Sequence, residues 1–212
     1  MLEHIQNNDF VSIITGRRSV RHYDEQVKIT TKEMQDIINE ASLAPSSANI
    51  QPWRVIVVHT PEGKDKLRPL VQFNTQQNDS SAAMLIILGD TQSEQYVEEI
   101  YNMAVEQGKM PQEVRDKQVS QILGMFPLLP RDMKIEIAKV DASLFAMQLM
   151  LVARAHGYDT NPMAGFERDK VVSAFDLDDE RYVPVMILSI GKAKQEGHES
   201  VRLPSDKITF WR

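Results

Sequence analysis

The stretch "APSSANIQPWR", Ala44–Arg54, joins an apolar helical pattern to a strand that continues as "VIVVH". A plain connection needs about four residues, whereas this one places two serines, an asparagine and a glutamine between two prolines. Because Pro45 and Pro52 fix the backbone, the loop is stiff. A stiff polar loop suits recognition of a heteroaromatic edge, but the pattern fits a turn that satisfies its own amides equally well.

Helices and a few widely separated strands surround this loop. Strands rich in β-branched residues are predicted over 53–59, 84–90 and 182–191. Helical spacing and capping signals, such as Thr30 three residues before Glu33, predict helices over 10–16, 30–44, 93–107, 111–123, 132–157 and 167–175, and one beginning at 60–61. Residues 161–166, "NPMAGF", are predicted to form a loop and the tail to be extended. Since strands and helices do not alternate regularly, we expect one α+β domain over 1–212 with a central, mostly antiparallel sheet wrapped by helices.

Composition narrows the function. The 212 residues are 42% hydrophobic and 25% charged, with a net charge of −6, which argues against nucleic acid and anionic membranes as partners. The absence of cysteine excludes disulfides and cysteine-bound metals, and it fits a cytoplasmic protein. The five histidines lack metal-ligand spacing, so no metal site is expected. The most apolar stretch, Ala142–Ala155, is too short to span a bilayer, and no signal peptide is visible.

Two further motifs carry candidate chemistry. "TGRRSVR" places Arg17, Arg18 and Arg21 around Ser19, and arginine forks with a hydroxyl suit a phosphate. The alternative to a phosphate site is an ordinary run of charged side chains exposed to solvent. "NPMAGFERD" places Gly165 just before a short helix, where backbone amides can donate to a ligand or can simply form a loop-to-helix turn. There is no G-x-G-x-x-G and no Walker motif.

The order of four motifs is more specific than any one of them. "RRSVR", "PSSANIQPWR", "NPMAGF" and "VRLP" occur in this order from near the start to near the end. Together they resemble the nitroreductase family of FMN-dependent NAD(P)H oxidoreductases, from Phe10 to the tail. The resemblance implies an α+β fold and an intertwined homodimer with two FMN sites at its interface. It also implies that residues 200–212 form an extended tail reaching the partner subunit, and we expect 93–132 to cover the pocket.

The resemblance implies that both ends of the chain hold the FMN phosphate. Arg17 and Ser19 match phosphate and ribityl contacts, and Arg202 matches the C-terminal phosphate arginine. Arg18 lies beside them. Arg21 matches the basic residue near flavin N1 and O2, where a fixed cation stabilises the negative charge left by two-electron reduction.

The remaining implied contacts come from three other segments. The loop that approaches the flavin of the neighbouring subunit corresponds to Pro45, Ser46, Ser47 and Asn49. The loop over the flavin, whose backbone amide donates to N5, corresponds to Pro162, Met163, Ala164 and Gly165. Asn74 resembles an amide that pairs with the pyrimidine edge. The chain departs from many relatives at Ala164, where they carry a glutamate, and from some at Gln77, where they place a second lysine near N1.

The implied activity is a ping-pong, two-electron reduction of a small-molecule acceptor, such as a nitroaromatic compound or a quinone, with NADH or NADPH as the donor. Because hydride moves through flavin N5, no catalytic side chain is required. Tyr96, Tyr101, Met125 and Phe126 are candidates for stacking on the substrate or, equally, for packing between helices. The alternatives are a flavin reductase, another flavin-dependent redox role on the same scaffold, and a non-catalytic flavin-binding protein.

Overall fold

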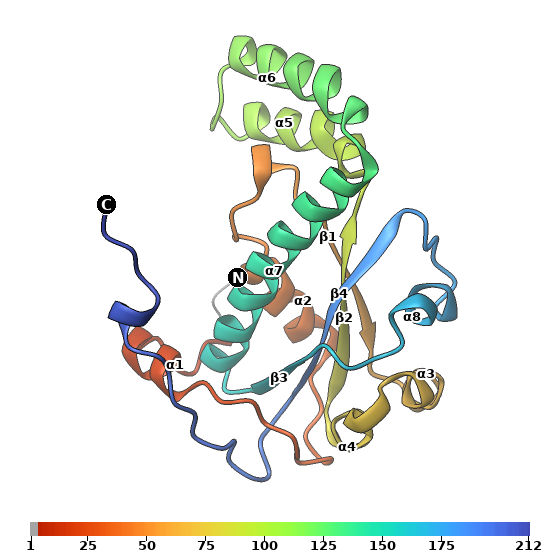
Figure 1. Ribbon diagram of the computed structural model, residues 1–212, viewed down its shortest axis with the longest axis vertical. Coiled ribbons are helices and arrows are strands. Elements are labelled where there is room, and N and C mark those ends of the chain that lie inside the picture. The colour runs from red at the N-terminus through yellow and green to blue at the C-terminus, as the bar shows by residue number, and fades with distance from the viewer. Residues whose placement is uncertain (1–3) are drawn as a thin grey trace.

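A four-stranded antiparallel sheet lies at the centre of the protein (Figure 1). The computed structural model describes residues 4–212, so residues 1–3 of the predicted domain lie outside the described part. The strands run in the order β1-β2-β4-β3, and each neighbouring pair is antiparallel. Their bounds are Trp53–Val58 for β1, Ala83–Asp90 for β2, Asp159–Met163 for β3 and Tyr182–Gly191 for β4. The predicted α+β class with a mostly antiparallel sheet is confirmed.

Helices cover both faces of this sheet because β2 buries side chains on both sides. Leu85 and Ile87 point to one face, where α2 (Thr31–Ala41) and the long α7 (Arg131–Ala155) pack. On that face the rings of Trp53 and Phe145 stack with centroids 5.2 Å apart. The alternate residues of β2, Met84 among them, point to the other face, where α3 (Pro61–Leu67) and α8 (Arg168–Ala174) pack. All eight residues of β2 are buried.

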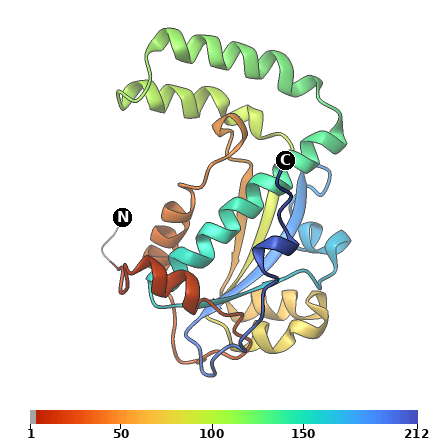
Figure 2. The same ribbon diagram turned by 60° about the vertical axis from the view of Figure 1, so that its left-hand side comes forward.

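The other helices lie outside this layered body. α5 (Val97–Glu106) and α6 (Gln112–Met125) form a hairpin that projects from one end of the sheet (Figure 2). α4 (Thr75–Ser80) lies near the other end, and α1 (Phe10–Gly16) packs against α7. Among residues 4–212, none of the helices combines the length and the apolar character that a bilayer span requires. Short 3-10 turns occupy Ser47–Asn49, Arg68–Leu70, Gln72–Asn74, Ser93–Tyr96, Phe126–Leu128 and Ser205–Lys207.

The starts of α1, α2 and α3 follow the capping chemistry of the sequence. The Asp9 side chain accepts from the Val11 amide at the start of α1, and the Thr30 hydroxyl accepts from the Glu33 amide at the start of α2. The prediction of a loop over 161–166 was wrong for its first half, because Asn161–Met163 are the last three residues of β3. β3 lies at the edge of the sheet, where a proline can replace an amide donor without leaving a partner unpaired.

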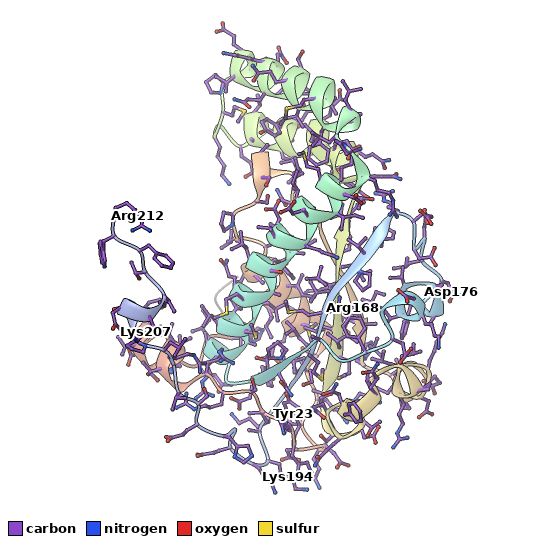
Figure 3. The ribbon with its side chains drawn as sticks, in the orientation of Figure 1. Tyr23, Arg168, Asp176, Lys194, Lys207 and Arg212 are labelled. Carbon is purple, nitrogen blue, oxygen red and sulfur yellow. The ribbon has the colours of Figure 1, made fainter. Side chains whose placement is uncertain are left out.

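The last residues of the chain leave this body. The tail after β4 runs past α1 and ends apart from the sheet (Figure 1). Lys207 and Arg212, labelled in Figure 3, lie on this projecting segment. Its apolar side chains are exposed, with Phe210 and Trp211 more than four-fifths accessible. Apart from the 3-10 turn Ser205–Lys207 the tail is extended, and its large apolar side chains stay exposed within residues 4–212.

Candidate functional site

A hollow of about 430 Å³ opens beside the end of β3, and three distant segments line it. Arg21 comes from the extended segment that follows α1. Phe73 and Asn74 come from the turn that leads into α4, and Gln76 and Gln77 come from α4 itself. Residues 161–165 come from the end of β3 and the loop after it. The structure thus brings together most of the residues predicted to surround the flavin ring: Arg21, Asn74, Gln77, Pro162, Met163, Ala164 and Gly165.

Hydrogen bonds tie two of these segments into a fixed rim. Asn74 Nδ2 donates to the Gly165 carbonyl oxygen at 2.9 Å, and Gln72 Nε2 donates to Glu167 Oε1 at 3.0 Å. The hydrogen bond from Gln72, helped by nearby Lys170, lowers the pKa of Glu167. Gln72 has a φ of 49°, a strained value for a residue with a side chain. These ties hold the loop that carries Gly165 against the turn before α4.

The hydrogen bonds of Asn74 limit what it can offer a ligand. Its Nδ2 donates to the carbonyl oxygens of Val71, at 3.2 Å, and Gly165. Its Oδ1 accepts from Gln77 Nε2 at 3.2 Å. Since an asparagine has two side-chain N–H donors, both are occupied. The remaining capacity of Asn74 is one lone pair on Oδ1, which suits a ligand N–H.

The segment that carries the arginines runs alongside β3. Ser19 forms an isolated parallel bridge with Thr160, and the Val20 amide donates to the Thr160 carbonyl oxygen at 3.1 Å. In an extended segment, alternate residues share a face, so Arg17, Ser19 and Arg21 lie on one side. Within residues 4–212, the Arg21 side chain has no hydrogen bond or ion pair. An unbalanced cation therefore lies at the hollow.

A second group of cations lies at the Arg17 end of the segment. Burial, followed by the charges of Arg202, Arg18 and Arg154, lowers the pKa of Arg17. No carboxylate or hydrogen-bond acceptor contacts the Arg17 guanidinium in the described part of the chain. Arg202 comes from the tail, so cations from two distant parts of the chain influence one another here. This arrangement suits a polyanionic group such as a phosphate.

The serine-rich loop does not join this site. None of Pro45, Ser46, Ser47 and Asn49 lines the hollow. The loop precedes β1 and lies beneath the α5–α6 hairpin, whereas α3 and α4 lie at the other end of β1 (Figure 1). Within a single chain, these four residues and the hollow are therefore separate.

Sequence reasoning missed several residues of this region. Gln72 and Phe73 precede Asn74, and Phe73 is 95% exposed at the hollow. Gln76 and Asn161 also line it. Arg154, at the end of α7, joins the cationic group although nothing in its local sequence sets it apart. The polar run "QFNTQQN" was the available signal for the residues around Asn74.

The four candidates for stacking on a substrate differ in exposure. Tyr101 and Phe126 are buried among the residues of the α5–α6 hairpin, so they pack between helices. Tyr96 is 39% exposed, and the Arg54 guanidinium lies over its ring at 4.5 Å. Met125 is exposed. Packing thus accounts for two of the four.

Comparison with known proteins identifies the group to which this architecture belongs. The family model described as "Nitroreductase family" matches residues 14–192. The chain belongs to the nitroreductase family. Its resemblance to this family, seen first in the order of four short motifs, is confirmed.

Several members of the nitroreductase family are similar over nearly their whole length. YdgI of Bacillus subtilis, named as an NAD(P)H nitroreductase, is 51% identical over 98% of this chain and 100% of its own. The CLA biosynthesis enone reductase of Lactiplantibacillus plantarum is 43% identical over 95% of this chain and 93% of its own. A protein of Exiguobacterium sibiricum, named as a nitroreductase and crystallised in complex with FMN, has a TM-score of 0.95 at 51% identity and covers 98% of this chain and 100% of its own.

Proposed function

We propose that the protein is an FMN-dependent NAD(P)H oxidoreductase of nitroreductase type, which reduces nitroaromatic, quinone or similar acceptors by two electrons in ping-pong order. The observation that carries this proposal is the pair of cations Arg17 and Arg202, from two distant parts of the chain, with Arg17 on the same extended segment that brings Arg21 to a polar hollow. The similarity to a protein crystallised with FMN supports the same cofactor.

The described residues suit FMN on three counts. The unbalanced guanidinium of Arg17, with Arg202, would hold the phosphate, whereas Arg18 lines a separate hollow with Val20 on the other side of the segment. The free lone pair on Asn74 Oδ1 would accept from the N–H of the pyrimidine edge. Arg21 would lie near N1 and O2 of the flavin. Each of these groups supplies the polarity that its part of the cofactor requires.

The protein contributes orientation and electrostatics. When bound, FMN supplies the two-electron, hydride-accepting chemistry at N5. The ties from Asn74 and Gln72 hold the loop of Gly165, so that a backbone amide of this loop can donate to N5. The cation of Arg21 stabilises negative charge near N1. We assign no side chain as a general acid or base, because the protein's contribution to the reaction is to position the cofactor and to stabilise charge.

We further propose that two copies form an intertwined dimer. α1, α7 and the tail expose apolar side chains, among them Phe10, Leu144 and Trp211. A monomer rarely leaves so many large apolar residues in contact with water. In such a dimer the tail would wrap the partner, and the loop of Ser46–Asn49 would approach the partner's flavin. A cytoplasmic location and the absence of nucleic-acid partners stay predictions from composition.

A second acceptor class follows from one relative. The enone reductase of Lactiplantibacillus plantarum is 43% identical to this chain. Reduction of a carbon–carbon double bond conjugated to a carbonyl needs the same two electrons from a reduced flavin. An enone is therefore the second candidate substrate, beside nitroaromatic compounds and quinones.

An absorbance spectrum of the freshly purified protein tests the proposal. We expect a yellow protein with a flavin spectrum that bleaches on addition of NADH or NADPH and recovers when an acceptor is added. A panel containing a nitroaromatic compound, a quinone, an enone and free flavin then ranks the acceptors. A colourless protein that does not bind added FMN would contradict the proposal, and a yellow protein that oxidises neither nucleotide would favour a non-catalytic role.

A further inference from the structure

The loop Ser46–Gln51 is held from two helices at once. Asp141, buried on α7, accepts two hydrogen bonds from Ser47: its Oδ2 from the backbone amide at 2.9 Å and its Oδ1 from the hydroxyl at 3.2 Å. Tyr101, buried on α5, donates its hydroxyl to the Ala48 carbonyl oxygen at 3.0 Å. The loop therefore depends on groups outside itself for its conformation.

The loop backbone needs such support because it is strained. The φ angles of Ala48, Asn49 and Gln51 are 47°, 53° and 46°. All three lie in the left-handed region, which residues with a Cβ atom disfavour. A short segment with three such residues relaxes unless its surroundings fix it. The hydrogen bonds from Ser47 to Asp141 lie directly beside this strained run.

The hydrogen bonds also determine which donors the loop has left for a ligand. Ser47 donates its hydroxyl proton to Asp141, so this proton is occupied. Ser46 Oγ accepts from the Gln51 amide at 3.1 Å and keeps its own proton. Asn49 Oδ1 accepts from Gln51 Nε2 at 3.3 Å, which leaves both N–H groups of its amide unused within residues 4–212. Ser46 and Asn49 therefore keep free side-chain donors within residues 4–212.

We propose that Asp141 is a positioning residue for flavin binding, which acts through Ser47 to hold the loop in the conformation that directs Ser46 and Asn49 towards the flavin of the neighbouring subunit. This inference rests on the proposed function. It gives a buried carboxylate on α7, outside the predicted contacts, a defined part in forming the site. It also gives Ser47 a structural task in place of direct contact through its hydroxyl proton.

The charge state of Asp141 matters for this task. An ionised carboxylate accepts both hydrogen bonds from Ser47 with charge assistance, whereas protonation of Asp141 leaves only weaker, neutral hydrogen bonds between the two residues. Burial raises the pKa of Asp141, and the hydrogen bonds from the Ser47 amide and hydroxyl partly oppose this effect. No charged side chain in the described chain contributes to the shift, and Ser47 supplies the polar groups that face the carboxylate. We therefore expect loop support to weaken as the pH falls through a value above the pKa of an ordinary aspartate.

The test compares Asp141→Asn with Glu136→Gln, an exposed carboxylate-to-amide change on the same helix. The dissociation constant for FMN is measured by flavin fluorescence over a range of acidic to neutral pH. Exchanging a charged for a neutral hydrogen bond should weaken FMN binding by about 3- to 10-fold near neutral pH. The wild type and Glu136→Gln should show an added loss of affinity on acidification that Asp141→Asn lacks. The titration of the FMN phosphate is common to all three proteins and cancels in their ratio.

A mutant cycle with Ser47→Ala separates positioning from general destabilisation. If Asp141 acts through Ser47, the two changes together should weaken FMN binding less than the product of their separate effects. Equal affinity and an equal pH profile for Asp141→Asn and the wild type would overturn the inference while leaving the proposed function intact. A wild type that fails to bind FMN would instead overturn the proposed function. If Asp141→Asn does not fold, Ser47→Ala on the exposed loop decides, and unchanged affinity in that variant overturns the inference.

Discussion

At the scale of single residues, Arg17 shows how the chain keeps charge available for a ligand. It lies among Arg18, Arg154 and Arg202, and its pKa is lowered by burial and by these three charges. Of the neighbours, Arg154 is paired with Asp159, whereas Arg17 has no such partner among the described residues. Repulsion within this group disfavours the ligand-free state, and a bound phosphate would relieve it.

We therefore expect Arg17→Ala to have opposite effects on binding and on stability. Loss of a charged hydrogen bond should weaken FMN binding by about 10- to 100-fold. The midpoint of thermal unfolding without flavin should stay the same or rise, since a repelled cation is removed. Arg202→Ala should weaken FMN binding to a similar degree. Titration of FMN and thermal melts of the apoprotein measure the two effects.

Lys28→Ala serves as the control for net charge, because Lys28 is exposed and lies outside the cationic group. It should leave FMN affinity unchanged. Unchanged affinity in both Arg17→Ala and Arg202→Ala would contradict the phosphate assignment.

At this scale the sequence predicted residue types better than their contacts. The spacing of "RRSVR" identified Arg17, Ser19 and Arg21 as a group, because neighbours in an extended segment stay together in space. Arg154 could not be found in this way, since it approaches Arg17 only after α7 packs against α1. The hydrogen bonds of Ser47 and Asn74 were equally hidden, because their partners Asp141 and Gly165 are far away in the sequence.

At the scale of elements, local sequence signals predicted most helices, but they did not reveal the strand β3. A capping hydroxyl or carboxylate begins α1, α2 and α3, and such caps are visible in any sequence. β3 contains asparagine and proline, which lower strand propensity. Its identity as a strand depends on pairing with β4 at the sheet edge, a long-range contact that the short segment does not reveal.

The end of α7 offers a test at this scale. Gly157 follows the helix with a φ of +83°, and the Gly157 and Tyr158 amides donate to the carbonyl oxygens of Arg154 and Ala153. This is a Schellman ending, which favours glycine. Gly157→Ala should lower the free energy of unfolding by about 1–2 kcal/mol, because a Cβ atom disfavours the left-handed conformation. Urea denaturation of the apoprotein measures the change.

Gly124→Ala is the matched control for this substitution. Gly124 lies within α6, and an added Cβ there meets no other atom within 4 Å. The same chemical change should therefore raise the free energy of unfolding by about 0.5–1 kcal/mol. A Gly157→Ala protein as stable as the wild type would rule out a conformational requirement at the end of α7.

At the scale of the whole molecule, the main feature without an explanation in a single copy is the exposed apolar surface. Val140, Leu144 and Met147 form an exposed stripe along α7, spaced by four and three residues. The tail adds Phe210 and Trp211. The loop of Ser46–Asn49 and the hollow at β3 are separate within one chain, so a site that combined them would need a second copy, as in the proposed dimer.

Leu144→Glu should break this dimer, because a carboxylate would be buried in an apolar interface. In sedimentation experiments we expect the wild type at twice the chain mass of 24.2 kDa and the variant at the chain mass. The FMN affinity of the variant should fall with the loss of the partner. Lys139→Glu, at an exposed position beside the stripe, should remain dimeric. A wild type that sediments as a monomer would contradict both the dimer and the shared site.

The order of the strands has a consequence for the emerging polypeptide during translation. β2 is buried on both faces, yet its partner β4 begins at Tyr182, close to the C-terminal end. A nascent chain that stops before that residue leaves one hydrogen-bonding edge of its most apolar strand open to other molecules. Completion of the sheet must therefore wait until the ribosome has released residues 182–191, and until then β2 is an aggregation-prone strand that chaperones have to shield.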